Sequence, residues 1–358
     1  MKMLSAIATC ILLAASALAY TTNSAGYIVS VVSTDPTTPG YDTNSLQGWE
    51  DWADGDPLSR GDSKYAAECH SKGLGECVLS GWVNSQSQGD APLVYAADTF
   101  RHPGFDNGVG AECGQINIQE DWTVVSNMVV RITAASKYGV IAGNSGQKWT
   151  VENCLLISEH SGSMDAVYLS ALISSTKIDC YVKNCIITGP WQNGIHVYCV
   201  NDFFTSPRAE LDVYYTSIDN SRGCGIKYTE QPSGPGTPRV DGLIYNVTAT
   251  RNDTQDYFNE NFYGSPNNGT VTGSHNADSD GTVTNVTSDS VLQNIVAANE
   301  FMAPDRGDLR LRADSQYFDA GTNLTSVTVD ALGVARGDPP TIGAFEDAGT
   351  LSLIVIVN

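Results

Sequence analysis

The sequence predicts an all-β solenoid, in which short strands stack coil upon coil. A phrase of Val, a polar residue, Asn and Cys occurs at 151–156 and again at 182–187, with a weaker forerunner at 125–130. A second phrase, in which aliphatic residues follow a small residue, lies between them and repeats at 138–141, 165–169 and 193–197. Self-similarity of this kind indicates one structural unit stacked on itself, and alternating β-branched residues identify that unit as a coil of strands.

The spacing of the first phrase sets the size of the coil. Its aligned Val or Leu positions are 125, 151, 182, 213 and 243, so that successive steps are 26, 31, 31 and 30 residues. Steps near 30 residues suit a coil of about three short strands with loops, and such strands stack in parallel. A further coil is expected to begin at Val283.

The first 19 residues are typical of a secretory signal peptide. Lys2 precedes an apolar stretch at 3–13, and Ala17-Leu18-Ala19 stands directly before Tyr20. We expect cleavage after Ala19 and therefore an extracellular protein; an uncleaved apolar strand is the alternative.

The region that follows the signal, at 20–115, lacks the repeat and predicts an N-terminal cap. A strand is expected at 26–32, and then a short helix that begins at the N-cap Ser45 and carries Leu46, Trp49 and Trp52 near one face. Such a helix would cover the open first coil, since an uncovered solenoid end exposes strand edges and apolar interior. The predicted order is therefore signal 1–19, cap 20–115, β-helix 116–300 and closing segment 301–358.

The repeated Asn and Cys residues are interpreted as structural. An amide side chain both donates and accepts, so Asn127, Asn153 and Asn184 could form a ladder along a repeated bend. Cys154 and Cys185 would stack on successive coils, either as a disulfide or as free thiols. Cys69 and Cys77 are close enough in sequence to close a small loop.

Charge restricts the classes of partner. The chain has 19 basic and 40 acidic residues, a net charge of −21, which repels nucleic acid and anionic lipid. After the signal, no apolar run reaches the length of a membrane span, and the apolar stretch at 351–357 is only strand-sized. We expect no nucleic-acid partner and no membrane span in the mature chain.

The Asn-Cys coils and the Asn-Gly-Ile coil at 193–195 resemble those of right-handed parallel β-helix proteins of the pectate-lyase-like superfamily. The C-terminal stretch is similar to the closing segment of many secreted bacterial and phage-encoded β-helix proteins, through 309–311, 315–321, 330–336 and 341–346. That family usually has Ser-Pro-Ala-Ile-Asp-Ala-Gly and an Asp before Ile-Gly-Ala; here Gln316-Tyr317-Phe318 and Thr341 depart from it. The resemblance implies the fold. It implies no single activity, because the superfamily includes lyases, hydrolases, adhesins and phage tailspikes.

Stacking of the second phrase predicts a column of outward side chains. Val140, Val167, Ile195 and Ile226 should point inward, so that the next residues, Ile141, Tyr168, His196, Lys227 and then Asn259, point outward. Two residues further along each strand come Gly143, Ser170, Tyr198 and Thr229. Tyr168, His196, Tyr198 and Lys227 therefore form the candidate substrate-binding patch.

The same patch offers groups for catalysis. Lys227 or His196 could act as base, and Tyr168 or Tyr198 could protonate a leaving oxygen. Arg222 could bind an acidic sugar and neutralise its carboxylate. The alternative is that these residues are an ordinary solvated surface. A hydrolase would need two paired carboxylates, and the spacing pairs none of Glu152, Asp165 and Asp256.

A calcium site is a further candidate, at 276–281. Asp278 and Asp280 fit the alternating oxygen donors of a calcium loop, but position 287, where an acidic ligand should close it, is Thr. An Asx-rich turn is the alternative.

These observations favour a protein that recognises or attaches to a cell-surface glycan. It would be secreted by a bacterium or lie on a virion surface as a tailspike-like or fibre-like component. One alternative is a polysaccharide lyase or glycoside hydrolase that uses the same outer face. Another is a purely structural virion or filament subunit, in which the strand at 351–357 joins a neighbouring copy into a homo-oligomer.

Overall fold

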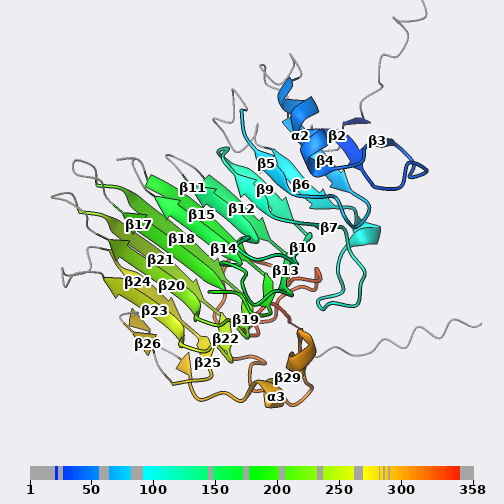
Figure 1. The fold of residues 1–358 in the computed structure, drawn as a ribbon. Coiled ribbons are helices and arrows are strands. Elements are labelled where there is room, and N and C mark those ends of the chain that lie inside the picture. The colour runs from blue at the N-terminus through cyan, green and yellow to red at the C-terminus, as the bar shows by residue number, and fades with distance from the viewer. Residues whose placement is uncertain are drawn as a thin grey trace, which may run out of the picture.

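The protein is a right-handed parallel β-helix (Figure 1). The computed structural model describes residues 21–22, 27–55, 64–81, 92–143, 148–171, 177–200, 206–231, 237–261, 269–281, 283–284, 287–288 and 291–346. The expected signal peptide at 1–19 and the apolar segment at 351–357 lie outside the described residues. Among the helices of these ranges, none is long and apolar enough to cross a membrane.

From Leu93 onward, each coil contributes one strand to each of three sheets, in the order A, C, B. The described strands of sheet A are β1 (Thr21–Thr22), β2 (Tyr27–Val32), β3 (Tyr41–Thr43), β4 (Lys64–Cys69), β6 (Leu93–Ala96), β9 (Thr123–Ser126), β12 (Lys148–Glu152), β15 (Lys177–Lys183), β18 (Arg208–Tyr214), β21 (Arg239–Tyr245), β24 (Val271–Ser274) and β27 (Thr287–Ser288). Those of sheet B are β5 (Cys77–Leu79), β8 (Ile116–Ile118), β11 (Val140–Gly143), β14 (Val167–Ala171), β17 (Ile195–Val200), β20 (Cys224–Gln231), β23 (Gln255–Asn261) and β26 (Val283–Thr284). Those of sheet C are β7 (Glu112–Cys113), β10 (Val129–Ile132), β13 (Leu155–Ser158), β16 (Ile186–Thr188), β19 (Ser217–Asp219), β22 (Thr248–Thr250), β25 (Asn276–Asp278) and β28 (Val291–Leu292).

The strand register follows the sequence phrase with two corrections. Val125, Val151, Val182 and Val213 are aligned in successive strands of sheet A, as predicted. The next aligned residue is Ile244 rather than Leu243, because β18 and β21 pair Val213 with Ile244. Val283 belongs to sheet B, where it pairs with Tyr257, so the expected sheet A phrase does not begin there.

The interior of the coil is a continuous apolar column. Val140, Val167, Ile195 and Ile226 point inward as predicted, and each is fully buried. Burial of their aliphatic surface supplies the main favourable free energy for stacking one coil on the next.

The predicted cysteine pairs form no disulfide. Cys154 and Cys185 are buried thiols whose Sγ atoms donate to the Val125 and Val151 carbonyl oxygens of the preceding coil, at 3.6 and 3.5 Å. Cys69 and Cys77 are also buried and free. Stacking of free thiols is therefore the alternative that the structure adopts for Cys154 and Cys185.

A left-handed bend joins sheet A to sheet C in successive coils. Asn127, Asn153, Asn184, Tyr215 and Asn246 occupy it with φ of 59°, 52°, 52°, 48° and 56°, so that Asn holds four of these five bends. Asn tolerates this conformation better than other residues with a side chain, which explains the repeat. The predicted ladder forms in part: Asn184 Nδ2 donates to Asn153 Oδ1 (3.2 Å), whereas Asn127 Nδ2 donates to the neighbouring Ser126 Oγ.

The N-terminal helix α2 (Leu46–Gly55) covers the first coils, as predicted. The Ser45 hydroxyl accepts a hydrogen bond from the Gly48 N–H at 3.0 Å and so caps the helix. Leu46 and Trp49 are fully buried in the main core, and Trp52 packs against it. The short 3-10 helix η2 (Asp98–Phe100) follows β6.

The closing segment, residues 301–346, folds back over the outer face of sheet C. Just before it lies helix α3 (Ala297–Glu300); the segment itself holds β29 (Phe301–Ala303), the 3-10 helix η4 (Pro304–Arg306) and β30 (Asp308–Leu311). Its Phe301, Tyr317 and Phe345 share a second hydrophobic core with Leu155 and Ile186 of sheet C. Sheet C is therefore largely buried on both faces, which explains why most of its strands show no alternation of buried and exposed residues.

Polar contacts fix the closing segment to the asparagine bends. Asn184 Nδ2 donates to the Val329 carbonyl oxygen (2.9 Å). Asn246 donates to the Thr322 carbonyl oxygen and accepts from the Thr322 N–H, at 2.8 and 2.7 Å. The bends thus serve as binding positions for the chain's own C-terminal region.

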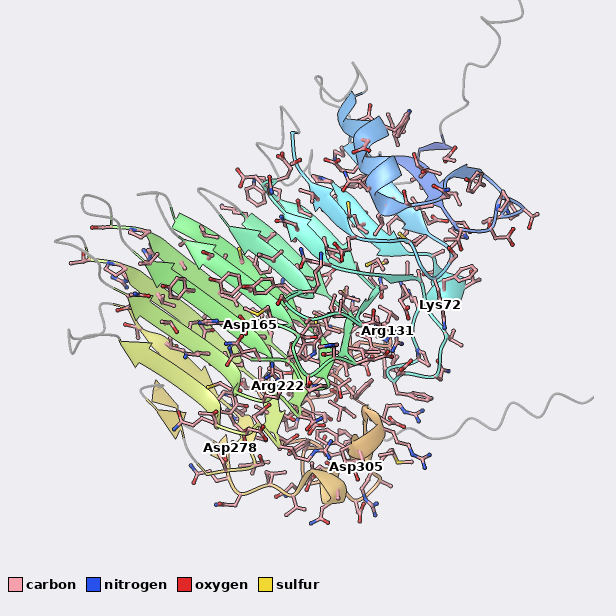
Figure 2. The ribbon with its side chains drawn as sticks, in the orientation of Figure 1. Lys72, Arg131, Asp165, Arg222, Asp278 and Asp305 are labelled. Atoms are coloured by element: carbon pink, nitrogen blue, oxygen red, sulfur yellow. The ribbon has the colours of Figure 1, made fainter. Side chains whose placement is uncertain are left out.

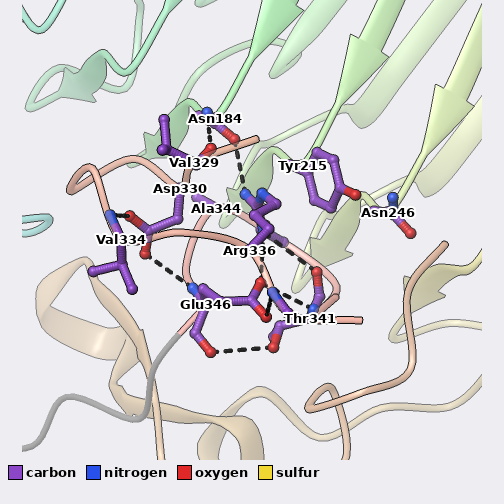
Figure 3. A network of polar contacts seen from close by, with 12 residues as sticks. Asn184, Tyr215, Asn246, Val329, Asp330, Val334, Arg336, Thr341, Ala344 and Glu346 are labelled. Carbon is purple, nitrogen blue, oxygen red and sulfur yellow. Dashed lines mark hydrogen bonds and ion pairs between the residues drawn. The ribbon is translucent and has the colours of Figure 1, made fainter. Parts of the chain in front are cut away.

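Arg336 lies at the centre of these contacts (Figure 3). Its guanidinium donates to Glu346 Oε2 (3.2 Å) and to Asn184 Oδ1 (2.8 Å), and lies 3.5 Å from the centroid of the Tyr215 ring. The side chains of Arg336 and Glu346 are only 3% and 10% exposed. Burial lowers the pKa of Arg336 to about 10.

We expect the Arg336→Ala variant to lose about 3–5 kcal/mol of unfolding free energy, because the substitution leaves Glu346 as an uncompensated buried charge. Urea denaturation measures this. Arg312→Ala is the matched control: Arg312 pairs with Asp314 at the surface, and its loss should change stability by less than about 0.5 kcal/mol. Equal effects of the two substitutions would contradict the role of Arg336.

Candidate functional site

The closing segment covers sheet C, so we sought the site on the outer faces of sheets B and A. Each face carries a cluster of aromatic and charged side chains. The cluster on sheet B includes the residues predicted from the sequence, and the cluster on sheet A does not.

The tyrosine–histidine patch on sheet B consists of Tyr138, Tyr168, His196 and Tyr198. The backbone register pairs Tyr168 with His196 and His196 with Lys227, so these three predicted residues lie side by side. The ring centroids of Tyr138 and Tyr168 stack at 4.9 Å, and those of Tyr168 and His196 meet edge-on at 5.4 Å. The predicted continuation to Asn259 is wrong, because the strand register aligns Phe258 with Lys227.

Buried polar groups hold His196 at both ring nitrogens. Nδ1 lies 3.1 Å from Asp165 Oδ2, and Nε2 lies 3.2 Å from Thr229 Oγ1. Asp165 is itself fixed by Asn193 Nδ2 at 2.7 Å. An acid, an imidazole and a hydroxyl thus stand in the order of a nucleophilic triad, but the Thr229 residue is only 1% exposed and a substrate cannot reach it.

The two basic candidates of the patch differ in their contacts. Lys227 is partly exposed and lies beside His196 in the strand register. Arg222 lies on the turn before β20, where its guanidinium donates to the carbonyl oxygens of Pro190 and Ser163, each at 3.0 Å (Figure 2). These bonds attach the Arg222 guanidinium to the backbone of earlier turns, so the guanidinium has a structural role.

A groove with a volume of about 530 Å³ crosses the outer face of sheet A. This sheet A groove is lined by side chains from three successive coils and the turn before β9, chiefly Trp122, Lys148, Asp179, Tyr181, Lys183 and Asp212. The register explains their meeting. Lys148 pairs with Asp179 and Tyr181 pairs with Asp212, so alternate residues of β12, β15 and β18 project from one face.

Aromatic rings and lysines alternate in the groove. Lys148 Nζ lies 4.4 Å from the centroid of the Trp122 ring, and Lys183 Nζ lies 4.7 Å from that of Tyr181. Rings of this kind combine a large apolar face with polar neighbours, which suits the mixed surface of a sugar.

Two carboxylates of the groove lie on neighbouring coils. Asp212 is one strand further than Asp179 and two residues further along it. With a strand spacing of ~4.8 Å and a rise of ~3.3 Å per residue, their Cα atoms are roughly 8 Å apart.

The environment of Asp212 favours its protonated form. The Asp212 residue is only 5% exposed, although Tyr214 Oη and the Leu243 N–H donate to its two oxygens at 2.8 and 3.0 Å. Burial raises its pKa to about 6.

The closing segment completes the groove. Ser326 lines it, and the neighbouring Val327 packs with Tyr214 and Tyr215 in a small cluster that also involves Tyr181. One side of the groove therefore comes from a segment more than a hundred residues away in sequence, and no local pattern indicated it.

The predicted calcium residues, Asp278 and Asp280, lie elsewhere, at a turn between sheets C and B. There the structure adds Asp256 of the preceding coil to them.

No protein-family model matches the chain, and no curated protein sequence is similar to it.

We expect Asp212 to make stability depend on pH. A carboxyl whose pKa rises from 3.8 to about 6 on folding binds its proton more tightly in the folded protein. Its stabilising contribution is therefore complete below pH ~4 and is lost as the pH rises through ~6. The stability of the wild type relative to Asp212→Asn should fall by about 2–3 kcal/mol between pH ~4 and ~7, as measured by urea denaturation. A difference that does not change with pH would contradict the raised pKa.

Proposed function

We propose that the protein binds a neutral glycan chain along the sheet A groove. The supporting observation is the groove itself, which combines the rings of Trp122 and Tyr181 with Lys148, Lys183, Asp179 and Asp212. Stacking on rings and hydrogen bonding to fixed polar groups is how proteins hold sugars, whose faces are apolar and whose rims are hydroxyls.

The charges in the groove favour a neutral ligand. Two lysines balance two aspartates there, so the groove has no strong charge of either sign. The whole chain, at −21, repels polyanions at long range.

The location of the protein and the group of β-helix proteins to which it belongs are part of the same proposal. We infer an extracellular β-helix of the pectate-lyase-like group, secreted by a bacterium or carried on a virion. Two features support this inference. The first 19 residues are typical of a signal peptide. In the closing segment, which resembles that of the family, Arg336 donates to the Glu346 carboxylate and the Glu346 N–H donates to Asp330 Oδ2. A purely structural subunit, joined through 351–357, is the alternative.

We expect Trp122→Ala and Tyr181→Ala each to weaken glycan binding about tenfold, because each removes a stacking ring. Binding to a panel of neutral and acidic polysaccharides is measured by affinity electrophoresis, and thermal melting checks the fold of each variant. Tyr168→Ala on sheet B is the matched control and should bind as the wild type does. Loss of binding in Tyr168→Ala alone would overturn the assignment to sheet A and favour the tyrosine–histidine patch.

A second function, hydrolysis of the bound glycan, is supported by the two carboxylates. Glycosidases use two carboxyl groups separated by ~5–9.5 Å, one of them an acid of raised pKa. Asp212, with its pKa of about 6, suits the acid, and Asp179 suits the base or nucleophile.

If the groove hydrolyses its ligand, incubation with the polysaccharide panel should release reducing ends, and the rate should fall as the pH rises through ~6. Asp212→Asn and Asp179→Asn should each lower the rate at least about 100-fold. Unsaturated products that disappear in Lys227→Ala and His196→Ala would instead show a lyase on sheet B. No product from any polysaccharide would leave binding as the sole function of the groove.

A further inference from the structure

Three aspartates meet at equivalent turns of two successive coils. Asp256 lies at the start of β23, Asp278 ends β25, and Asp280 lies in the turn that follows (Figure 2 labels Asp278). One carboxylate oxygen from each lies within 4.8 Å of the other two. The cluster therefore spans the two coils at the point where sheet C turns into sheet B.

Two of the three carboxylates are completely buried. Asp256 and Asp278 are both 0% exposed, and within the described ranges neither forms an ion pair. Arg251, whose backbone N–H donates to Ser279 Oγ beside the cluster, uses its guanidinium to bind Asp219 and Asp305. The cluster thus carries negative charge that Arg251 does not neutralise.

One oxygen of the cluster lacks a hydrogen bond from any of the residues that the structure describes. Asp256 accepts from Asn252 Nδ2 (2.6 Å) and from the N–H and hydroxyl of Ser279 (2.5 and 2.9 Å). Asp278 Oδ1 accepts from the Gly281 N–H (2.7 Å), and the Asn294 N–H also stabilises this carboxylate. Asp278 Oδ2 is buried and has no hydrogen-bond partner in the part of the chain that the structure describes.

A buried oxygen of this kind needs a counterion or a proton. Burying an unpaired carboxylate costs several kcal/mol, so such groups are paired, coordinate a metal or become neutral.

We propose that Asp256, Asp278 and Asp280 bind one Ca²⁺ ion, which links the two coils. Calcium takes oxygen ligands at ~2.3–2.6 Å, so two ligands of one ion lie at most ~5 Å apart, and the cluster meets this limit. Asp280 is exposed and provides the entry path from solvent. Gly281, with φ of 71°, allows the tight turn that brings Asp278 and Asp280 together.

The site differs from the calcium loop that the sequence suggested. That loop would be closed by an acidic residue further along the chain, and position 287 is Thr. Here the third carboxylate comes instead from Asp256, which precedes Asp278 by one coil. Stacking supplies the ligand that the linear motif lacks.

Calorimetric titration of CaCl2 into the full chain, previously stripped with EDTA, tests the proposal. We expect one ion per chain, with Kd in the range of about 10⁻⁶ to 10⁻³ M. Asp278→Asn and Asp280→Asn should each weaken binding at least about tenfold. The control Asp98→Asn removes an exposed charge of the N-terminal region, 89% exposed and paired with Arg101, and should bind as the wild type does.

Thermal melting separates calcium binding from a merely structural role. Saturating Ca²⁺ should raise the Tm of the wild type, because it binds the folded state alone. Asp278→Asn should lose that rise, yet melt in EDTA at or above the wild-type temperature, since a buried charge is gone. Because Asp280 is exposed, Asp280→Asn should leave the EDTA melting temperature unchanged. No calcium heat in the wild type at millimolar concentration, or wild-type affinity in both variants, would overturn the proposal.

Discussion

The structure depends on a left-handed backbone bend that successive coils make between sheet A and sheet C. Asn127, Asn153, Asn184, Tyr215 and Asn246 hold that bend, and its repetition keeps the strands in register. Because the bends are stacked, their polar groups form a row along the outside of the helix. The closing segment binds this row through Arg336 and Thr322, so one local conformation fixes both the coil and its cover.

The cover decides where function can lie. Phe301, Tyr317 and Phe345 bury the outer face of sheet C, which leaves the outer faces of sheets A and B for ligands. The same segment brings Ser326 to the sheet A groove. The closing segment, which shields sheet C from solvent, therefore also shapes the surface proposed to bind a glycan.

The two open faces differ in what their polar groups offer a ligand. On sheet B, Asp165 and Thr229 hold both nitrogens of His196, so the imidazole has a structural task. On sheet A, Asp212 is kept near protonation by burial and lies beside rings and lysines that line a groove. This contrast is the reason for placing the proposed function on sheet A, and the variants of Trp122 and Tyr168 separate the two faces.

The sequence alone determined the coil. Alternation along each strand and the repeated phrases predicted the register from Val125 to Val213 and the inward column at Val140 and Val167. The N-cap Ser45 and the apolar residues that follow it predicted the capping helix. These features are local or repeat at one period, so they can be read along the chain. Tertiary structure decided the groove and the acidic cluster, because Asp179 meets Asp212, and Asp256 meets Asp278, only after coils stack at steps that vary with loop length. It also decided the closing contacts of Arg336, which join positions more than a hundred residues apart and leave no periodic signal.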